Sequence, residues 1–104
     1  MVREIKTKAE FDELLNSTSN LIVVDFFATW CGPCKMISPK IEEFSNTYGD
    51  VVFVKVDVDN NTDTSEACGI SAMPTFHLYK GGKKVDELVG ASAAKLEELI
   101  KSHK

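Results

Sequence analysis

Apolar residues follow two different periods along the chain, and each change of period marks a predicted element. The nearly unbroken apolar run over 21–28 and the alternating run over 51–58 are typical of buried strands. Phe11, Leu14 and Leu15 have i, i+3, i+4 spacing, which predicts the apolar face of a helix. Strands that alternate with helices indicate an α/β domain.

Turn and cap residues predict the remaining elements. Residues 2–5 favour a short edge strand, and Thr7 and Glu10 have the spacing of a capping box at the start of the first helix. A helix is expected after the second cysteine and ends near Gly49, and a weak helix over 60–68 is stopped by Gly69. Two antiparallel strands are expected over 75–79 and 85–89, followed by a last helix capped by Ser92. The order βαβαβαββα predicts a mixed central sheet with helices on both faces, in a single domain over 1–104.

The helix after the second cysteine contains a proline. Its apolar stripe includes Ile37, Ile41 and Phe44. Pro39 cannot donate to the carbonyl of Lys35 and clashes with it, so we expect a kink there. The alternative is a helix that begins later and accommodates Pro39 in its first turn.

Composition and charge exclude several classes of function. The 104 residues are 43% hydrophobic and 27% charged, with a net charge of -4 and scattered lysines. Neither nucleic acid nor an anionic membrane is an expected partner. Three cysteines cannot form a fully paired secreted framework. The N-terminal segment has no apolar signal core, so we expect a cytoplasmic protein, without excluding entry into the nucleus.

The candidate chemistry lies in two cysteines at the junction between the 21–28 strand and the following helix. Gly32 and Pro33 form a bend that allows Cys31 and Cys34 to close a small disulfide. Cys31 is expected at the helix N-terminus, where unpaired N–H groups favour a thiolate, so it is the predicted nucleophile. Cys34 lies one turn further on, is expected to be further from solvent, and is predicted to resolve a mixed disulfide.

The cysteine pair has two other interpretations. A CxxC motif is also half of a zinc site, but Cys68, His77 and His103 belong to no second paired motif, and we expect no metal. We expect His77 to point outward from its strand and His103 to lie in a frayed end, with no catalytic role for either. A purely structural disulfide across so short a loop would stabilise little, so redox exchange is favoured.

Asp25 is a carboxylate in the middle of the apolar 21–28 run. Burial of an unpaired carboxylate is costly and should raise its pKa. If Asp25 points under the active-site turn, it is placed to accept the proton of Cys34. The alternative is a surface position on a bent strand.

Three motifs carry a resemblance to a known family. Residues 30–35 read Trp-Cys-Gly-Pro-Cys-Lys, residues 23–26 read Val-Val-Asp-Phe, and residues 73–76 read Met-Pro-Thr-Phe. Together they resemble the thioredoxins over essentially the whole chain. The resemblance implies the thioredoxin fold, with Asp25 on the central strand as proton acceptor. It also implies that Lys55 lies near Asp25 and partly offsets its charge, although a lysine at this position could equally be solvated.

The resemblance further implies a docking surface for disulfide-bearing clients. Pro74 is expected to be cis and to face the cysteines, leaving the backbone of Met73 to pair with an extended client. Trp30 is expected on the surface, with a place in the core as the alternative. The expected substrate-binding residues are Trp30, Gly32, Pro33, Met73, Pro74, Thr75, Gly90 and Ala91.

Cys68 resembles an extra cysteine of animal-type thioredoxins. One interpretation is a small buried hydrophobe at the end of a short helix, and the other is a regulatory or intermolecular thiol.

The resemblance implies a general protein-disulfide reductase that maintains cell redox homeostasis. It implies a monomer with no bound cofactor, recycled by an NADPH-dependent thioredoxin reductase. Expected clients are ribonucleotide reductase, peroxiredoxins and methionine sulfoxide reductases. An oxidising or isomerising domain is one alternative, but Pro33 stands where a histidine would favour oxidation. A docking module whose cysteine chemistry is incidental is the other.

Overall fold

The computed structural model describes residues 2–104. The predicted order βαβαβαββα is confirmed. The elements are β1 (Arg3–Glu4), α1 (Lys8–Leu15), β2 (Ile22–Phe27), α2 (Gly32–Thr47), β3 (Val52–Asp57), α3 (Thr62–Ala67), β4 (Thr75–Lys80), β5 (Lys83–Val89) and α4 (Ala93–His103). None of the helices in this part of the chain is long and apolar enough to cross a membrane.

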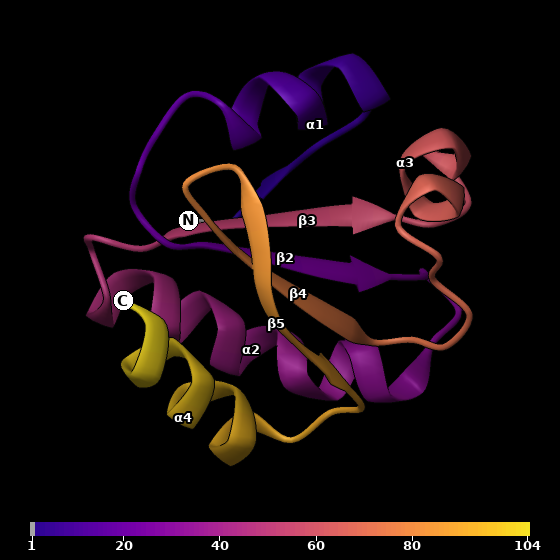
Figure 1. Ribbon diagram of the computed structural model, residues 1–104. Coiled ribbons are helices and arrows are strands. Elements are labelled where there is room, and N and C mark those ends of the chain that lie inside the picture. The colour runs from indigo at the N-terminus through magenta and orange to yellow at the C-terminus, as the bar shows by residue number, and fades with distance from the viewer. Residues whose placement is uncertain (1) are drawn as a thin grey trace.

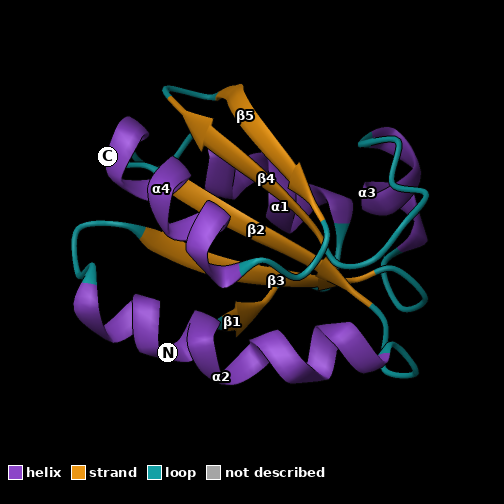
Figure 2. Cartoon of the chain, turned by 90° about the horizontal axis from the view of Figure 1, so that it is seen from below, coloured by secondary structure: helices purple, strands orange, loops and turns teal. Residues whose placement is uncertain are grey.

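The five strands form one mixed sheet in the order β1-β3-β2-β4-β5, which Figure 2 shows from bottom to top. β1, β3 and β2 are parallel, whereas β4 is antiparallel to β2 and to β5. α1 and α3 cover one face and α2 and α4 the other (Figure 1), so the predicted mixed sheet with helices on both faces is confirmed. The carboxyl ends of β2 and β3 meet at one edge, where open α/β sheets place their sites.

β2 is covered on both faces, which explains its apolar sequence. Ile22, Val24 and Phe26 pack into the core under α1 and α3. Val23 packs into the core under α2 and α4. Complete burial of a side chain such as Phe26 contributes about 1.5–3 kcal/mol. Because side chains alternate along a strand, Asp25 lies on the same face as Val23, toward α2.

Of the two hydrogen bonds in the predicted capping box of α1, the one accepted by the Thr7 side chain is present. Thr7 Oγ1 accepts the N–H of Glu10 at 3.1 Å. The Glu10 carboxylate accepts the N–H of Lys6 at 2.9 Å and pairs with Arg3 at 2.9 Å, so it does not return to Thr7. Glu10 therefore ties α1 to β1 and to the segment that follows it.

Pro39 lies well inside α2, which runs without interruption from residue 32 to residue 47. The alternative that placed Pro39 in the first turn is wrong, because Pro33 occupies that turn. The kink at Pro39 stays a prediction.

The predicted positions of both histidines are wrong. His77 is only 3% exposed, because β4 lies inside the sheet, and its ring meets that of Phe26 at a centroid distance of 5.0 Å. His103 is the last residue of α4, and its Nε2 lies 2.9 Å from Asp86 Oδ2 on β5. This contact anchors the end of the helix to the sheet.

Asn61→Ala should destabilise the protein more than the loss of an ordinary helix cap. Asn61 is 4% exposed; its Oδ1 accepts the N–H of Thr64 at 3.3 Å, and its Nδ2 donates to the Ile5 carbonyl at 3.2 Å. Losing the cap and leaving the buried carbonyl unpaired should together lower the free energy of unfolding, measured in urea, by about 2–4 kcal/mol. The exposed cap Thr7→Ala should cost about 1 kcal/mol. Equal losses would contradict this double role of Asn61.

Candidate redox-active site

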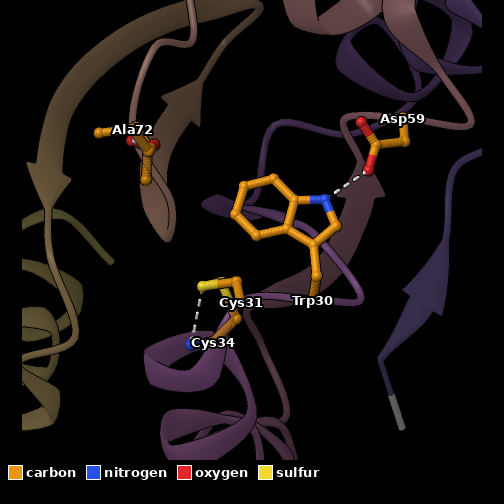
Figure 3. Close-up of a disulfide and its surroundings, with 6 residues drawn as sticks. Trp30, Cys31, Cys34, Asp59 and Ala72 are labelled. Atoms are coloured by element: carbon orange, nitrogen blue, oxygen red, sulfur yellow. Dashed lines mark hydrogen bonds between the residues drawn. A yellow bond between two sulfur atoms is a disulfide. The ribbon is translucent and has the colours of Figure 1, made fainter.

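Cys31 and Cys34 form a disulfide at the start of α2. Cys31 is the N-cap of the helix, the Cα atoms are 5.3 Å apart, and the N–H of Cys34 lies 3.2 Å from Cys31 Sγ. Figure 3 shows this contact at the end of the helix. The unpaired N–H groups and positive dipole end of α2 therefore face the Cys31 sulfur, as predicted from the sequence.

The two cysteines are equally buried. Each is 5% exposed, so the prediction that Cys34 lies further from solvent is wrong for the disulfide form. Both cysteines and Ala28 form one small buried cluster. Phe27, Val58 and Met73 pack against this cluster. Exposure therefore does not distinguish the two cysteines, whereas their positions along α2 differ.

Asp25 and Cys34 line the same pocket, which has a volume of about 240 Å³ and also includes Lys55. Asp25 is 6% exposed, so its alternative surface position is wrong. Its Oδ1 has no hydrogen-bond partner among residues 2–104. Burial raises the pKa of Asp25 from 3.8 to about 7, against the opposing effect of Lys55. This carboxyl can therefore gain or lose a proton near neutral pH.

Lys55 is half-buried beside Asp25. The two residues are partners in the register between β2 and β3, and both line the pocket. The Lys55 ammonium lies 5.5 Å from the centre of the Phe27 ring. Lys55 is thus neither fully solvated nor fully paired with the carboxylate, and it moderates the cost of charging Asp25.

Trp30 is 67% exposed, so its alternative place in the core is wrong. Its indole N–H donates to Asp59 Oδ2 at 2.9 Å, and Figure 3 shows the N–H edge of the ring directed at Asp59. Asp57 Oδ1 in turn accepts the N–H of Asp59 at 2.9 Å. Asp59 was missed in the sequence analysis. The available signal was that Asp59 lies two residues after the end of β3 and Trp30 three residues after the end of β2. The ends of neighbouring parallel strands meet at the same edge of a sheet.

The loop before β4 reaches the cysteine cluster, and the loop after β5 is hydrogen-bonded to that loop. The Met73-Pro74 peptide bond is cis, as expected, and Met73 packs against the cysteine cluster. The N–H of Gly90 donates to the Pro74 carbonyl at 2.9 Å and joins the loops. Gly90 has φ of 112°, which favours glycine. Thr75 is buried, whereas Gly32, Pro33 and Ala91 are exposed.

Cys68 does not belong to this cluster. It ends α3, packs against the core under α1 and α3, and lies with its Sγ 3.7 Å from the Tyr79 hydroxyl. Burial raises the pKa of the Cys68 thiol, which reduces its thiolate fraction at neutral pH. Both interpretations of Cys68 stay open, and the environment favours the structural one.

No group of three or more His, Cys, Asp and Glu side chains within residues 2–104 is arranged to hold a metal ion.

The fold and the site define a class of protein. The protein has a disulfide at the N-terminus of a helix and, in the adjoining pocket, a carboxyl that titrates near neutral pH. These are the groups that a thiol–disulfide oxidoreductase uses. Such a protein carries two electrons in its own cysteines.

Comparison with known proteins identifies the family. Residues 2–102 match the family profile described as Thioredoxin. Thioredoxin-1 of Schizosaccharomyces pombe is 52% identical over 103 residues, which cover 99% of this chain and 99% of that protein. Thioredoxin of Equus caballus is 52% identical over 102 residues, or 97% of each chain. Fasciola hepatica thioredoxin, solved by X-ray crystallography, is 46% identical and superposes with a TM-score of 0.97 over 99% of this chain and 100% of its own.

The chain belongs to the thioredoxin family. It has the thioredoxin fold and is a protein-disulfide reductase. Membership of the family implies no bound cofactor and partners that include a reductase and disulfide-bearing clients.

Asp59→Ala should release the Trp30 ring from its fixed orientation. Trp30 is the only tryptophan, so its fluorescence anisotropy and the resonance of its indole N–H report directly on the contact with Asp59. We expect lower anisotropy and an N–H shift toward the value of free indole. Asp59→Asn retains an acceptor oxygen and should preserve most of both signals. Unchanged signals in Asp59→Ala would show that other contacts hold the ring.

Proposed function

We propose that the protein is an electron donor in which Cys31 is the nucleophile and Cys34 the resolving thiol. The single observation that carries this assignment is the position of Cys31 as the N-cap of α2, with Cys34 one turn inside the helix. The helix N-terminus stabilises a thiolate at Cys31.

The proposed reaction transfers two electrons in two exchanges. The Cys31 thiolate attacks one sulfur of the client disulfide, forming a mixed disulfide and expelling the other client sulfur as a thiolate. Cys34 then loses its proton and attacks the Cys31 sulfur. The Cys31–Cys34 disulfide forms, the remaining client thiolate leaves, and the client has been reduced.

Asp25 is the proposed acceptor for the proton of Cys34. The support is the shared pocket and the pKa of about 7, which lies near the working pH expected of an efficient general base. The pocket is large enough for a water to relay the proton between the two groups. Lys55 is the proposed partner that limits the rise in the pKa of Asp25.

The proposed docking surface is the mostly uncharged rim around Cys31. The exposed ring of Trp30 forms one side. The backbone of Met73 is the proposed pairing edge for an extended client segment. The other proposed contributors are Gly32, Pro33, Pro74, Thr75, Gly90 and Ala91.

For its partners, we propose an NADPH-dependent thioredoxin reductase that regenerates the dithiol. A peroxiredoxin is a supported client, because a relative 40% identical comes from structural work on the thiol resolving mechanism in yeast mitochondrial 1-Cys peroxiredoxin via glutathione/thioredoxin systems. Ribonucleotide reductase and methionine sulfoxide reductases are proposed on family grounds, as are a monomeric state and a cytoplasmic location.

The test is the redox equilibrium of the Cys31–Cys34 couple in glutathione buffers, followed by Trp30 fluorescence. We expect a potential below that of the cytosolic glutathione pool, about −220 to −260 mV by extraction methods. Such a couple donates electrons to clients under cellular conditions. A potential near −120 to −180 mV, roughly that of oxidising and isomerising catalysts, would overturn the reductase direction.

A further inference from the structure

A second pocket lies beside the proposed docking loops. This side pocket has a volume of about 150 Å³, and its lining includes Ser71, Ala72, Thr75, His77, Glu87 and Val89. Four of these are exposed, namely Ser71, Ala72, Glu87 and Val89. Figure 3 shows Ala72 on the loop that faces the corner formed by Trp30 and Cys31.

The chain makes this side pocket continuous with the docking surface. Ala72 immediately precedes Met73, and Val89 immediately precedes Gly90. The hydrogen bond from the Gly90 N–H to the Pro74 carbonyl, at 2.9 Å, holds the two loops together. A client segment that follows these loops would therefore pass the mouth of the side pocket.

His77 brings a neutral ring to the side pocket. Its side chain is 4% exposed, and its Nδ1 has no hydrogen-bond partner among residues 2–104. Burial lowers the pKa of His77, so the ring is neutral at physiological pH. The Glu87 carboxylate, 3.9 Å from Nε2, favours the tautomer with the proton on that nitrogen.

Glu87 brings a negative charge to the same pocket. Its side chain is 51% exposed, and its Oε1 accepts a hydrogen bond from the Lys84 ammonium at 2.7 Å. An exposed pair of this kind contributes only about 0–1 kcal/mol and exchanges readily. The carboxylate also has lone pairs for further donors. An accessible carboxylate in a pocket whose lining residues include no lysine or arginine is complementary to a cation with N–H donors.

We propose that the side pocket is a specificity subsite for a lysine or arginine side chain of the client, a few residues from the client cysteine. The inference rests on the proposed docking of clients along Met73 and Gly90. In this arrangement the cationic head exchanges with Lys84 at Glu87, beside the neutral ring of His77. The overall charge of -4 attracts cationic clients but does not select where their charge lies.

The test uses synthetic peptides with one cysteine, disulfide-bonded to a chromogenic thiol whose release is followed by stopped-flow absorbance. In one series, each peptide has a single lysine at one of the three positions on either side of the cysteine. In the matched series, norleucine or glutamine replaces that lysine. We expect the reduced protein to react about two- to fivefold faster with lysine than with norleucine at one or two positions, the effect of an accessible ion pair. Glutamine should give no gain at these positions, and Glu87→Gln should remove the lysine preference.

Glu98→Gln is the matched control. It makes the same change of charge at an exposed residue of α4, on the other face of the sheet, and should retain the preference. A gain that is equal at all positions, or that survives in Glu87→Gln, would assign the effect to overall charge. No gain at any position would overturn the subsite. If no peptide reacts faster than the chromogenic disulfide without a peptide, the proposed docking itself has failed.

Discussion

Cys34→Ser is expected to stop multiple turnover while leaving the first attack on a client intact. With no second thiol, the mixed disulfide on Cys31 has no internal route to resolution and accumulates. Steady-state reduction of a protein disulfide should fall by at least about a thousandfold, as for other essential nucleophiles. Non-reducing electrophoresis and intact mass should show one client chain per molecule, attached at Cys31.

The controls separate the two cysteines and the two classes of function. All proteins carry Cys68→Ser, so that only the Cys31–Cys34 pair can react. Cys31→Ser should lose both turnover and trapping, since Cys34 lies inside the helix and lacks the N-cap position. A docking module would instead retain client affinity in both variants without forming a covalent adduct. Trapping through Cys34 in Cys31→Ser would reverse the proposed roles.

The chemistry at the end of β2 could be predicted because it depends on local sequence. A CxxC motif after a long apolar run places one cysteine at a helix N-terminus in any strand–turn–helix unit. The carboxylate of Asp25 has only apolar neighbours in sequence, so its burial and raised pKa also follow from the pattern. Cys31, Cys34 and Asp25 accordingly lie together in the structure.

The wrongly predicted positions of His77 and His103 and the missed Asp59 have one common cause. Contacts between residues far apart in sequence determine where these side chains lie. Alternation along β4 predicts correctly that His77 and Phe76 lie on opposite faces, but not that both faces are covered. The anchor of His103 on Asp86 and the bond between Trp30 and Asp59 join residues far apart in sequence. Such side-chain pairs leave no periodic signal in the sequence. Only the meeting of parallel strand ends at one edge indicated where Asp59 lies.

Asp25→Asn is expected to stabilise the oxidised protein at pH 8 and to leave its stability nearly unchanged at pH 4. The pKa of Asp25 is about 7 in the folded protein and about 3.9 in an unfolded chain. Between these values the folded state holds a proton that the unfolded state has lost, so stability falls as pH rises through this window. At pH 8 the full penalty of the buried charge is present, about 4 kcal/mol at about 1.4 kcal/mol for each pH unit between the two values.

Asp57→Asn is the matched control, because the same substitution should have the opposite effect there. Asp57 is 3% exposed, but its carboxylate accepts hydrogen bonds from the N–H of Asp59 at 2.9 Å and from Asn60 Nδ2 at 3.2 Å. Loss of this charged acceptor should cost about 1.5–3 kcal/mol. Urea unfolding of each variant at pH 4, 6 and 8 checks that Asp25→Asn raises the free energy of unfolding at high pH and that Asp57→Asn lowers it. A stability gain for Asp25→Asn that is equal at all three pH values would exclude a buried ionisable carboxyl as its cause.

The same Asp25→Asn substitution is expected to slow the resolution of the mixed disulfide. Asparagine cannot accept the Cys34 proton, and general bases typically contribute about 10²–10⁴-fold. Because the pocket of about 240 Å³ can admit water as a substitute acceptor, we expect a smaller loss, about tenfold or more at pH 8. In single-turnover experiments, formation of the mixed disulfide should be unaffected and its decay slowed. In the unsubstituted protein the decay rate should fall below a pH near 7, as the Asp25 carboxylate becomes protonated, and this inflection should vanish in Asp25→Asn. An inflection that persists would assign the proton transfer to another group.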